Sequence, residues 1–109
     1  METEVARQRL DKWLWFSRLV KTRKLAADLI AQGFVRVDGK RAEHSAKPVG
    51  AGHVLTIAFE RRVVVLEILG LAERRGPYAE ASRLYRLIDE AEAAAPFRRS
   101  RQVKLSQSG

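Results

Sequence analysis

The segment KWLWFSRLVKTRK, residues 12–24, places two tryptophans and a phenylalanine among five Lys and Arg side chains. Such a mixture fits two arrangements. One is an amphipathic helix with its rings in the core and its charges in water. The other is a surface that neutralises the phosphates of a polyanion and offers rings on which bases can stack. The rest of the chain has to decide between them.

Side chains suited to catalysis or metal binding are scattered along the chain. His44 and His53 have no Cys, His or acidic partner at metal-ligand spacing, which favours two unrelated surface histidines. Ser17, Ser45 and Ser82 lack the sequence surroundings of an activated nucleophile. We therefore expect a protein that is not an enzyme and that has neither a metal site nor a cofactor.

The charge balance points to an anionic partner. The 109 residues carry a net charge of +8, and residues 7–47 hold eleven Lys and Arg against four Asp and Glu. A hydrophobic fraction of 46% predicts a folded chain. The sequence has no cysteine, no apolar leader and no apolar run long enough for a bilayer, so we expect a cytoplasmic protein without membrane contact.

Local signals predict the elements that carry these charges. Apolar residues at helical spacing predict a helix over 10–17, with Trp13 in the core and Trp15 either packed or free to stack on a base. Thr22 can cap a second helix that ends at Gly33. Asp38-Gly39 between alternating residues predicts a tight hairpin, because a type I′ turn needs positive φ at both central positions.

The second half of the sequence predicts two strands and a helix. The strands are expected over residues 54–59 and 63–71. Pro77 can begin a last helix, whose apolar stripe comprises Ala81, Leu84, Tyr85 and Ile88. These elements give an α+β fold with the order α-α-β-β-β-β-α. We expect a domain over residues 7–71, a helical extension over 72–93 and a flexible basic tail over 94–109.

The basic residues of the first half fall on three successive elements, which favours a binding face over an ordinary solvated one. They are Arg9, Lys12, Arg18, Lys21, Arg23, Lys24, Arg36, Lys40, Arg41 and Lys47. Two successive helices also allow a helix-turn-helix interpretation on DNA. The second helix, however, offers only Arg23, Lys24 and Asp28 as long or charged polar side chains, and none of them is an Asn or Gln that could read a base. This favours recognition of phosphates and shape.

The stretch RLDKWLWFSRLVKTRKLAADLIAQGFVRVDGKR, residues 9–41, carries a family pattern. The pattern comprises Arg9-Leu10-Asp11, Thr22-Arg23, Ala26, Ile30, Gly33 and VRVDG at 35–39. By these residues the segment from Arg9 to Phe59 resembles the S4 domain, an RNA-binding module. Arg74-Arg75, Glu80-Ala81 and Leu84-Tyr85 extend the likeness to a ribosome-associated, heat-shock branch of the family. The resemblance implies an S4-like (αL motif) fold, in which two N-terminal helices pack on a small, mainly antiparallel sheet, followed by a C-terminal helix.

The resemblance also implies a partner and a site. The partner would be ribosomal RNA of the large subunit, in the recycling of subunits that carry peptidyl-tRNA after heat stress. The peptidyl-tRNA itself would be a second partner. The RNA-binding residues would be Arg9, Lys12, Lys21, Thr22, Arg23, Gln32, Arg36, Lys40 and Arg41. We further expect a monomer with at most weak DNA binding. Two alternatives stay open: a detached S4 module that targets an RNA-modifying enzyme, and a small DNA-binding regulator.

Overall fold

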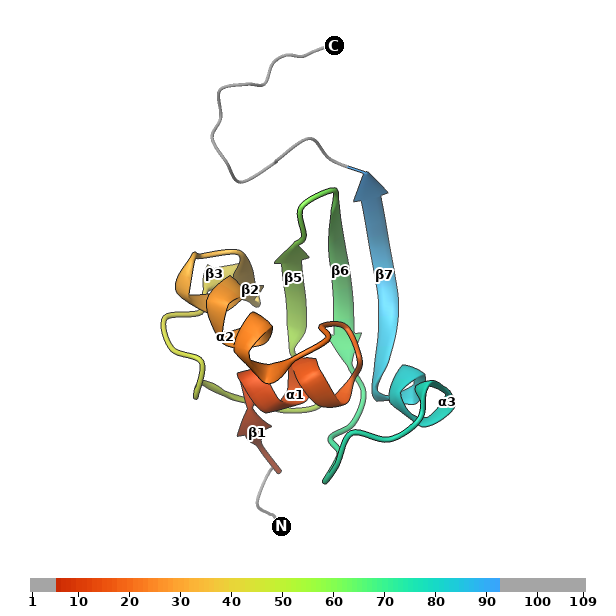
Figure 1. The fold of residues 1–109 in the computed structure, drawn as a ribbon. Coiled ribbons are helices and arrows are strands. Elements are labelled where there is room, and N and C mark those ends of the chain that lie inside the picture. Colours follow the sequence, from red (N-terminus) through yellow and green to blue (C-terminus); the bar gives the residue numbers. More distant parts are fainter. Residues whose placement is uncertain (1–5, 93–109) are drawn as a thin grey trace, which may run out of the picture.

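In the computed structural model, which describes residues 6–92, two helices cover one face of an antiparallel sheet (Figure 1). The five-stranded sheet has the order β3-β2-β5-β6-β7, and β1 and β4 form a separate two-stranded sheet. The elements are β1 (Gln8–Arg9), α1 (Leu10–Phe16), α2 (Arg23–Ala31), β2 (Val35–Val37), β3 (Lys40–Arg41), β4 (Pro48–Val49), β5 (Val54–Ala58), β6 (Arg62–Ile68), α3 (Tyr78–Ala81), a 3₁₀ turn (Ser82–Leu84) and β7 (Tyr85–Glu92). The predicted α+β, S4-like fold class is confirmed.

The two N-terminal helices begin and end close to where the sequence predicts. Trp13 is fully buried, and its indole N–H donates to the carbonyl of Gly70 at 2.9 Å. Thr22 caps α2 by accepting from the backbone N–H of Leu25 at 3.0 Å. Gly33, with φ of +85°, follows the end of α2 in a conformation that side chains disfavour. The helix predictions and the core position of Trp13 are confirmed.

The hairpin between β2 and β3 has the predicted turn. Asp38 and Gly39 both have positive φ, 51° and 86°, as a type I′ turn requires. The Asp38 carboxylate also accepts from the backbone N–H of Val54 at 2.9 Å, which ties the turn to the start of β5. The position of Lys40, next in the chain, is therefore set by two neighbouring strands.

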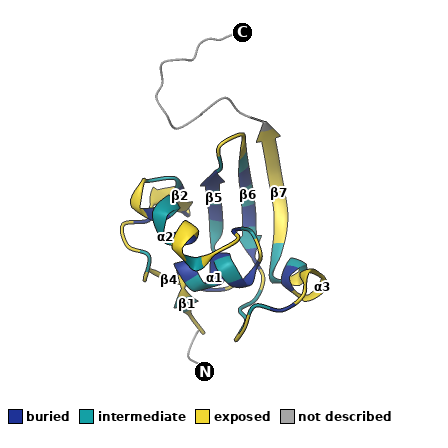
Figure 2. Cartoon of the chain, viewed as in Figure 1, coloured by how far each residue is buried: buried dark blue, intermediate teal, exposed yellow. Residues whose placement is uncertain are grey.

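The core lies between α1, α2 and one face of the sheet. Leu55 pairs with Leu66, and Ile57 pairs with Val64, so alternate residues of β5 and β6 point to the same side. All four are at least 98% buried. Figure 2 shows this buried strip along β5 and β6, whereas β7 is exposed over most of its length.

The predicted last helix is wrong beyond its first turns. α3 ends at Ala81, and the 3₁₀ turn leads directly into β7. β7 pairs with β6 from Tyr85 to Glu92, with one register shift at Ile88. The open edge of β6 exposes unpaired backbone groups, and pairing them outweighs the helical periodicity around Tyr85 and Ile88. Tyr85 also packs edge-on against Trp13, with ring centroids 6.3 Å apart, and its burial raises the pKa of its phenol.

This change also alters the nature of the expected extension over residues 72–93. Its longest element is a strand, and that strand is the edge of the same sheet that contains β5 and β6. The expected tail over 94–109 lies outside the described residues. Within residues 6–92, no helix has the length and apolar character needed to cross a membrane.

The small β1–β4 sheet was not predicted. Gln8 lies opposite Val49, and the backbone N–H of Leu10 donates to the carbonyl of Lys47 at 2.9 Å. A two-residue strand carries too little periodicity to be recognised in a sequence. Its consequence is that the chain before α1 lies against the segment that follows the hairpin.

Candidate nucleic-acid interface

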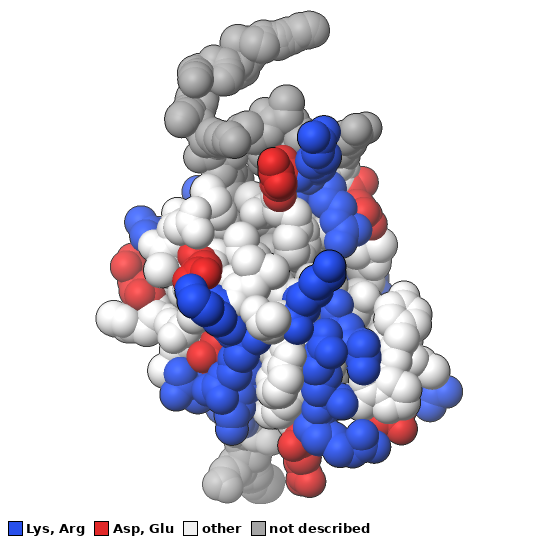
Figure 3. Space-filling view, in the orientation of Figure 1, with Lys and Arg blue, Asp and Glu red and all other residues white. Residues whose placement is uncertain are grey.

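Lys and Arg side chains gather over the face that carries α1 and α2, with a few acidic side chains among them (Figure 3). We call this the helical face and define its cations as Arg9, Lys12, Lys21, Arg23 and Lys24. All five belong to the predicted binding set. The hydrogen bonds and ion pairs of the described residues separate them into cations fixed by the fold and cations without a partner.

A buried carboxylate fixes two arginines of the helical face. Asp11 is only 4% exposed. It accepts from Nε and Nη2 of Arg9, both at 3.0 Å, and from the backbone N–H of Lys12 at 2.8 Å. Its Oδ2 atom is also 3.6 Å from Nε of Arg23. Asp11 thereby links the start of α1 to the start of α2.

The two arginines nevertheless remain accessible. Their side chains are 47% and 40% exposed, for Arg9 and Arg23 respectively. The hydrogen bond and charge of Asp11 raise the pKa of Arg9. Arg9 is thus held by two hydrogen bonds and Arg23 by a longer ion pair. Both guanidinium groups keep exposed surface for a phosphate contact.

The lysines of the helical face are less constrained. Lys24 forms an exposed ion pair with Asp28, one helical turn away, at 3.2 Å. Lys21 is exposed and Lys12 is half-buried. Among residues 6–92, neither of these two ammonium groups has an ion-pair or hydrogen-bond partner. Both are available to a polyanion.

Two other predicted arginines hold the fold together. Arg18 adopts a left-handed backbone conformation, with φ of 64°, and its Nε donates to the carbonyl of Gly76 at 2.6 Å. Arg41 donates to the carbonyl of Ala31 at 3.1 Å, across the end of α2. A left-handed residue that is not glycine cannot be read from sequence, and neither can an acceptor 58 positions away.

The remaining predicted residues lie at the edges of the helical face. The hydroxyl of Thr22 is engaged as the cap of α2, and Gln32 is exposed at the opposite end of that helix. Arg36, on the hairpin, donates to the carbonyl of Gly39 at 3.4 Å. The structure therefore brings Arg9, Lys12, Lys21, Arg23 and Thr22 together and leaves Gln32 at a distance along α2.

Trp15 packs within the protein. Its ring lies 5.6 Å from that of Phe16, and the guanidinium of Arg75 lies 5.8 Å from the ring centroid. Arg75 also donates to the carbonyls of Trp15 and Val20, at 3.1 and 3.3 Å. The alternative in which this indole is free to stack on a base is therefore not favoured, and the interface is cationic rather than aromatic.

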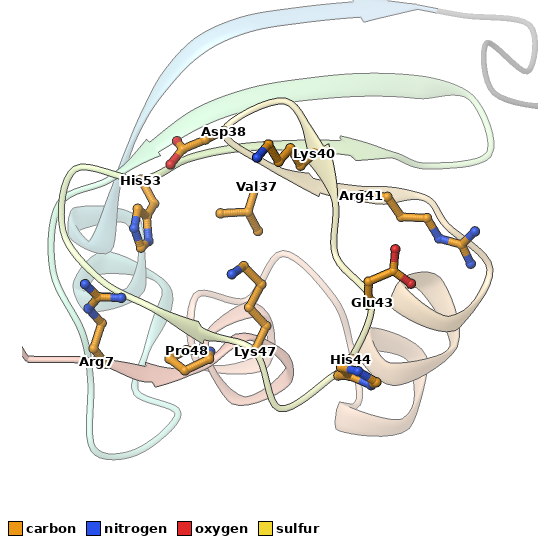
Figure 4. A pocket seen from close by; sticks show the side chains of 10 residues that line it. All are labelled: Arg7, Val37, Asp38, Lys40, Arg41, Glu43, His44, Lys47, Pro48 and His53. Carbon is orange, nitrogen blue, oxygen red and sulfur yellow. The ribbon is translucent and has the colours of Figure 1, made fainter.

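The cations Lys40 and Lys47 belong to a second place, a hollow of about 600 Å³ beside the hairpin (Figure 4). We call this the hairpin hollow. Its ten lining residues are Arg7, Val37, Asp38, Lys40, Arg41, Glu43, His44, Lys47, Pro48 and His53. Sequence reasoning missed the contribution of Arg7 and of the two histidines, because only the β1–β4 pairing brings these segments together. In the part of the chain that is described, no group of three or more metal-ligating side chains could hold a metal ion.

Comparison with known proteins gives consistent results. Residues 8–55 match the S4 domain family. Heat shock protein 15 of Escherichia coli (strain K12) is 44% identical over 80 residues, covering 71% of this chain and 57% of that protein. The RQC P-site tRNA stabilizing factor of Bacillus subtilis (strain 168) is 34% identical over 82 residues, covering 75% of this chain and 93% of that protein.

A solved structure shares the fold. It is the trimeric structure of Vibrio cholerae heat shock protein 15, with a TM-score of 0.72 and 35% identity over 76% of this chain and 83% of that one. A trimeric neighbour gives no support to the expectation of a monomer. The chain spans little more than half the length of the Escherichia coli relative, 57%. None of the three names describes a catalytic activity or a DNA-binding protein.

Proposed function

This chain belongs to the S4 domain family, and on that premise we propose that it binds structured RNA on the ribosome through the helical face. The observation that carries the proposal is the pair of half-exposed arginines held by buried Asp11. They are flanked by Lys12 and Lys21, which have no partner within residues 6–92. Groups fixed in this way meet phosphates at set spacings, which recognises the shape of a folded RNA and not its sequence.

The contacts of α2 argue against base reading in a DNA groove. Lys24 and Asp28 pair with each other, and Arg23 is held by Asp11. Little is left on this helix to contact base edges, which DNA-reading helices do with several side chains. The proposal therefore favours RNA over duplex DNA, and it assigns the protein a binding role without catalysis.

We further propose that the RNA is ribosomal RNA of the large subunit, with a bound peptidyl-tRNA as a second contact. Relatives named as a heat shock protein and as a P-site tRNA stabilizing factor support this assignment. The cellular role would be the rescue of large subunits that retain peptidyl-tRNA after heat stress. We expect the protein to sediment with large subunits and to bind them more tightly when they carry peptidyl-tRNA. Equal binding to large subunits with and without peptidyl-tRNA would contradict this part of the proposal.

The salt dependence of binding tests the interface itself. If ~4–6 phosphates are neutralised, log K should fall with log[salt] at a slope of about −3 to −5. The measurement is fluorescence anisotropy with a structured ribosomal RNA fragment and with a DNA duplex of equal length, from 50 to 300 mM salt. A slope near zero would exclude phosphate contacts, and tighter binding to the duplex would favour a DNA-binding regulator.

A further inference from the structure

The hairpin hollow has the construction of a site for one compact anion. One side is formed by the β1–β4 pair and by Arg7, which precedes β1. The other side is the β2–β3 hairpin (Figure 4). Arg7, Lys40 and Lys47 reach it from three separate segments. Within residues 6–92, none of these three side chains has an ion-pair or hydrogen-bond partner. Their charge is therefore not used by the fold.

The side chains around the hollow differ in direction. Figure 4 shows the ammonium of Lys47 pointing into the hollow, with Lys40 along the rim beside Asp38. Arg7 and His53 point toward each other at one end. Arg41, Glu43 and His44 complete the lining, with Arg41 and His44 directed away from the centre.

The charges of the lining leave a small positive excess. The lining contains four basic side chains, Arg7, Lys40, Arg41 and Lys47, and two carboxylates, those of Asp38 and Glu43. The charged ends of Arg41 and Glu43 both point away from the centre of the hollow (Figure 4), so leaving this pair out does not change the balance. With both histidines neutral, the lining carries a net charge of +2. One oxygen of Asp38 is already occupied by the backbone N–H of Val54.

His53 adds a defined hydrogen-bond donor. The backbone N–H of Gly50 donates to its Nδ1 atom at 3.1 Å. In a neutral imidazole the proton then resides on Nε2, which is left as a donor. Val37 and Pro48 supply apolar wall beside it. The hollow therefore combines cations, one oriented donor and an apolar surface.

We propose that the hairpin hollow binds a phosphomonoester, a phosphate attached to its carrier at one oxygen only. Such a group carries about −1.5 to −2 charges at neutral pH and three acceptor oxygens, which matches a net lining charge of +2 and several convergent donors. A phosphodiester within a strand carries one negative charge and is joined to a nucleoside on each side. It therefore suits an open surface better than a recess. The inference extends the proposed RNA binding, because the carrier would be the end of an RNA strand or a free nucleotide.

The two carriers can be distinguished with simple probes. We would compare one short RNA bearing a 5′-phosphate or a 5′-hydroxyl, and separately AMP against adenosine. Binding would be followed by anisotropy for the RNAs and by backbone amide NMR shifts at Gly39 and Gly50 for the nucleotides. A 5′-phosphate preference without AMP binding would identify strand ends. AMP shifts that adenosine does not reproduce would extend the site to free nucleotides.

Matched variants connect the preference to the hollow. We expect Lys47→Gln to reduce the preference for the phosphorylated RNA by about tenfold, the size of one lost charge-assisted contact. Arg7→Gln should act in the same direction. Lys21→Gln, which removes equal charge from the helical face, should weaken the binding of both RNAs by the same factor. The preference for the 5′-phosphate should then be unchanged. All these side chains are exposed, and unchanged melting temperatures would show that the variants are folded.

The outcomes separate this inference from the proposed function. If both RNAs bind equally well to the wild-type protein, the hollow is not a phosphomonoester site, although RNA binding stands. If neither RNA binds, the proposed function fails, and the AMP titration then tests the hollow by itself. A glutamate-rich peptide that shifts Gly39 and Gly50 as strongly as AMP would overturn the assignment to phosphate and favour a protein partner.

Discussion

The helical face and the hairpin hollow are both cationic, but they hold their charges in different ways. On the helical face, Arg9 and Arg23 are oriented by Asp11 before any ligand arrives. In the hollow, Lys40 and Lys47 have no partner within residues 6–92. Oriented groups lose less conformational freedom on binding, whereas free lysines keep their full charge and adapt to the ligand. The basic side chains of this sequence therefore fall into two groups: those that form ion pairs within the protein, and those that remain available to a ligand.

The strongest test of this contrast is Asp11→Asn. The substitution keeps the size of the side chain but removes the charge that holds two arginines. We expect a loss of about 1–3 kcal/mol in the free energy of unfolding, the range for hydrogen bonds to a buried charged group. Urea denaturation provides the measurement. Asp28→Asn is the matched control, since that carboxylate has one exposed partner and its loss should cost at most about 0.5 kcal/mol. Equal losses of stability in the two variants would show that Asp11 does not hold the two arginines more firmly than an exposed ion pair would.

Arg23→Ala should have a smaller effect on stability and a clear one on binding. The ion pair is long, at 3.6 Å, and the arginine is 40% exposed, so we expect a loss of about 0.5–1 kcal/mol in stability. RNA affinity should fall by about 1–3 kcal/mol if this group contacts a phosphate. Arg86→Ala is the control, because Arg86 pairs with Glu67 on β6, away from both basic regions. Equal losses of RNA affinity would mean that only net charge matters.

Lys40→Gln should leave stability unchanged within about 0.5 kcal/mol, because the side chain is exposed and has no partner among residues 6–92. If Lys40 contacts a phosphate, the slope of log K against log[salt] should become shallower by about 1. Thermal unfolding and a salt titration with the same RNA check the two expectations. A marked fall in melting temperature would show that the hollow is structural and would remove its contrast with the helical face.

Elements with local signals could be predicted from the sequence. The cap at Thr22 engages Leu25 only three residues away. The turn depends on the positive φ of two adjacent residues, Asp38 and Gly39. β7 could not be predicted in this way, because the helical spacing of Ala81, Leu84, Tyr85 and Ile88 is opposed only by the unpaired edge of β6. That edge exists only after the sheet has formed.

The candidate site shows the same limit. Sequence could identify which residues are basic and that they fall on neighbouring elements. It could not indicate that Arg18 bonds to Gly76, or that Arg7 reaches the same hollow as Lys40, because these relations depend on packing between distant segments. Composition predicted that the surface charge is positive, and tertiary structure decided which charged side chains are available to a ligand.

The bonds from α1 to the segment before α3 have a consequence for the order in which the chain matures. Trp13 donates to Gly70, and Arg75 donates back to Trp15, across separations of 57 and 60 residues. During synthesis the N-terminal helices emerge first, yet the groups that anchor them are added much later. Contacts this far apart in sequence also form slowly, because a long loop must close before they contribute. The helical face therefore gains its final rigidity only after translation has passed Arg75, and a nascent chain shorter than that should not yet bind RNA with full affinity.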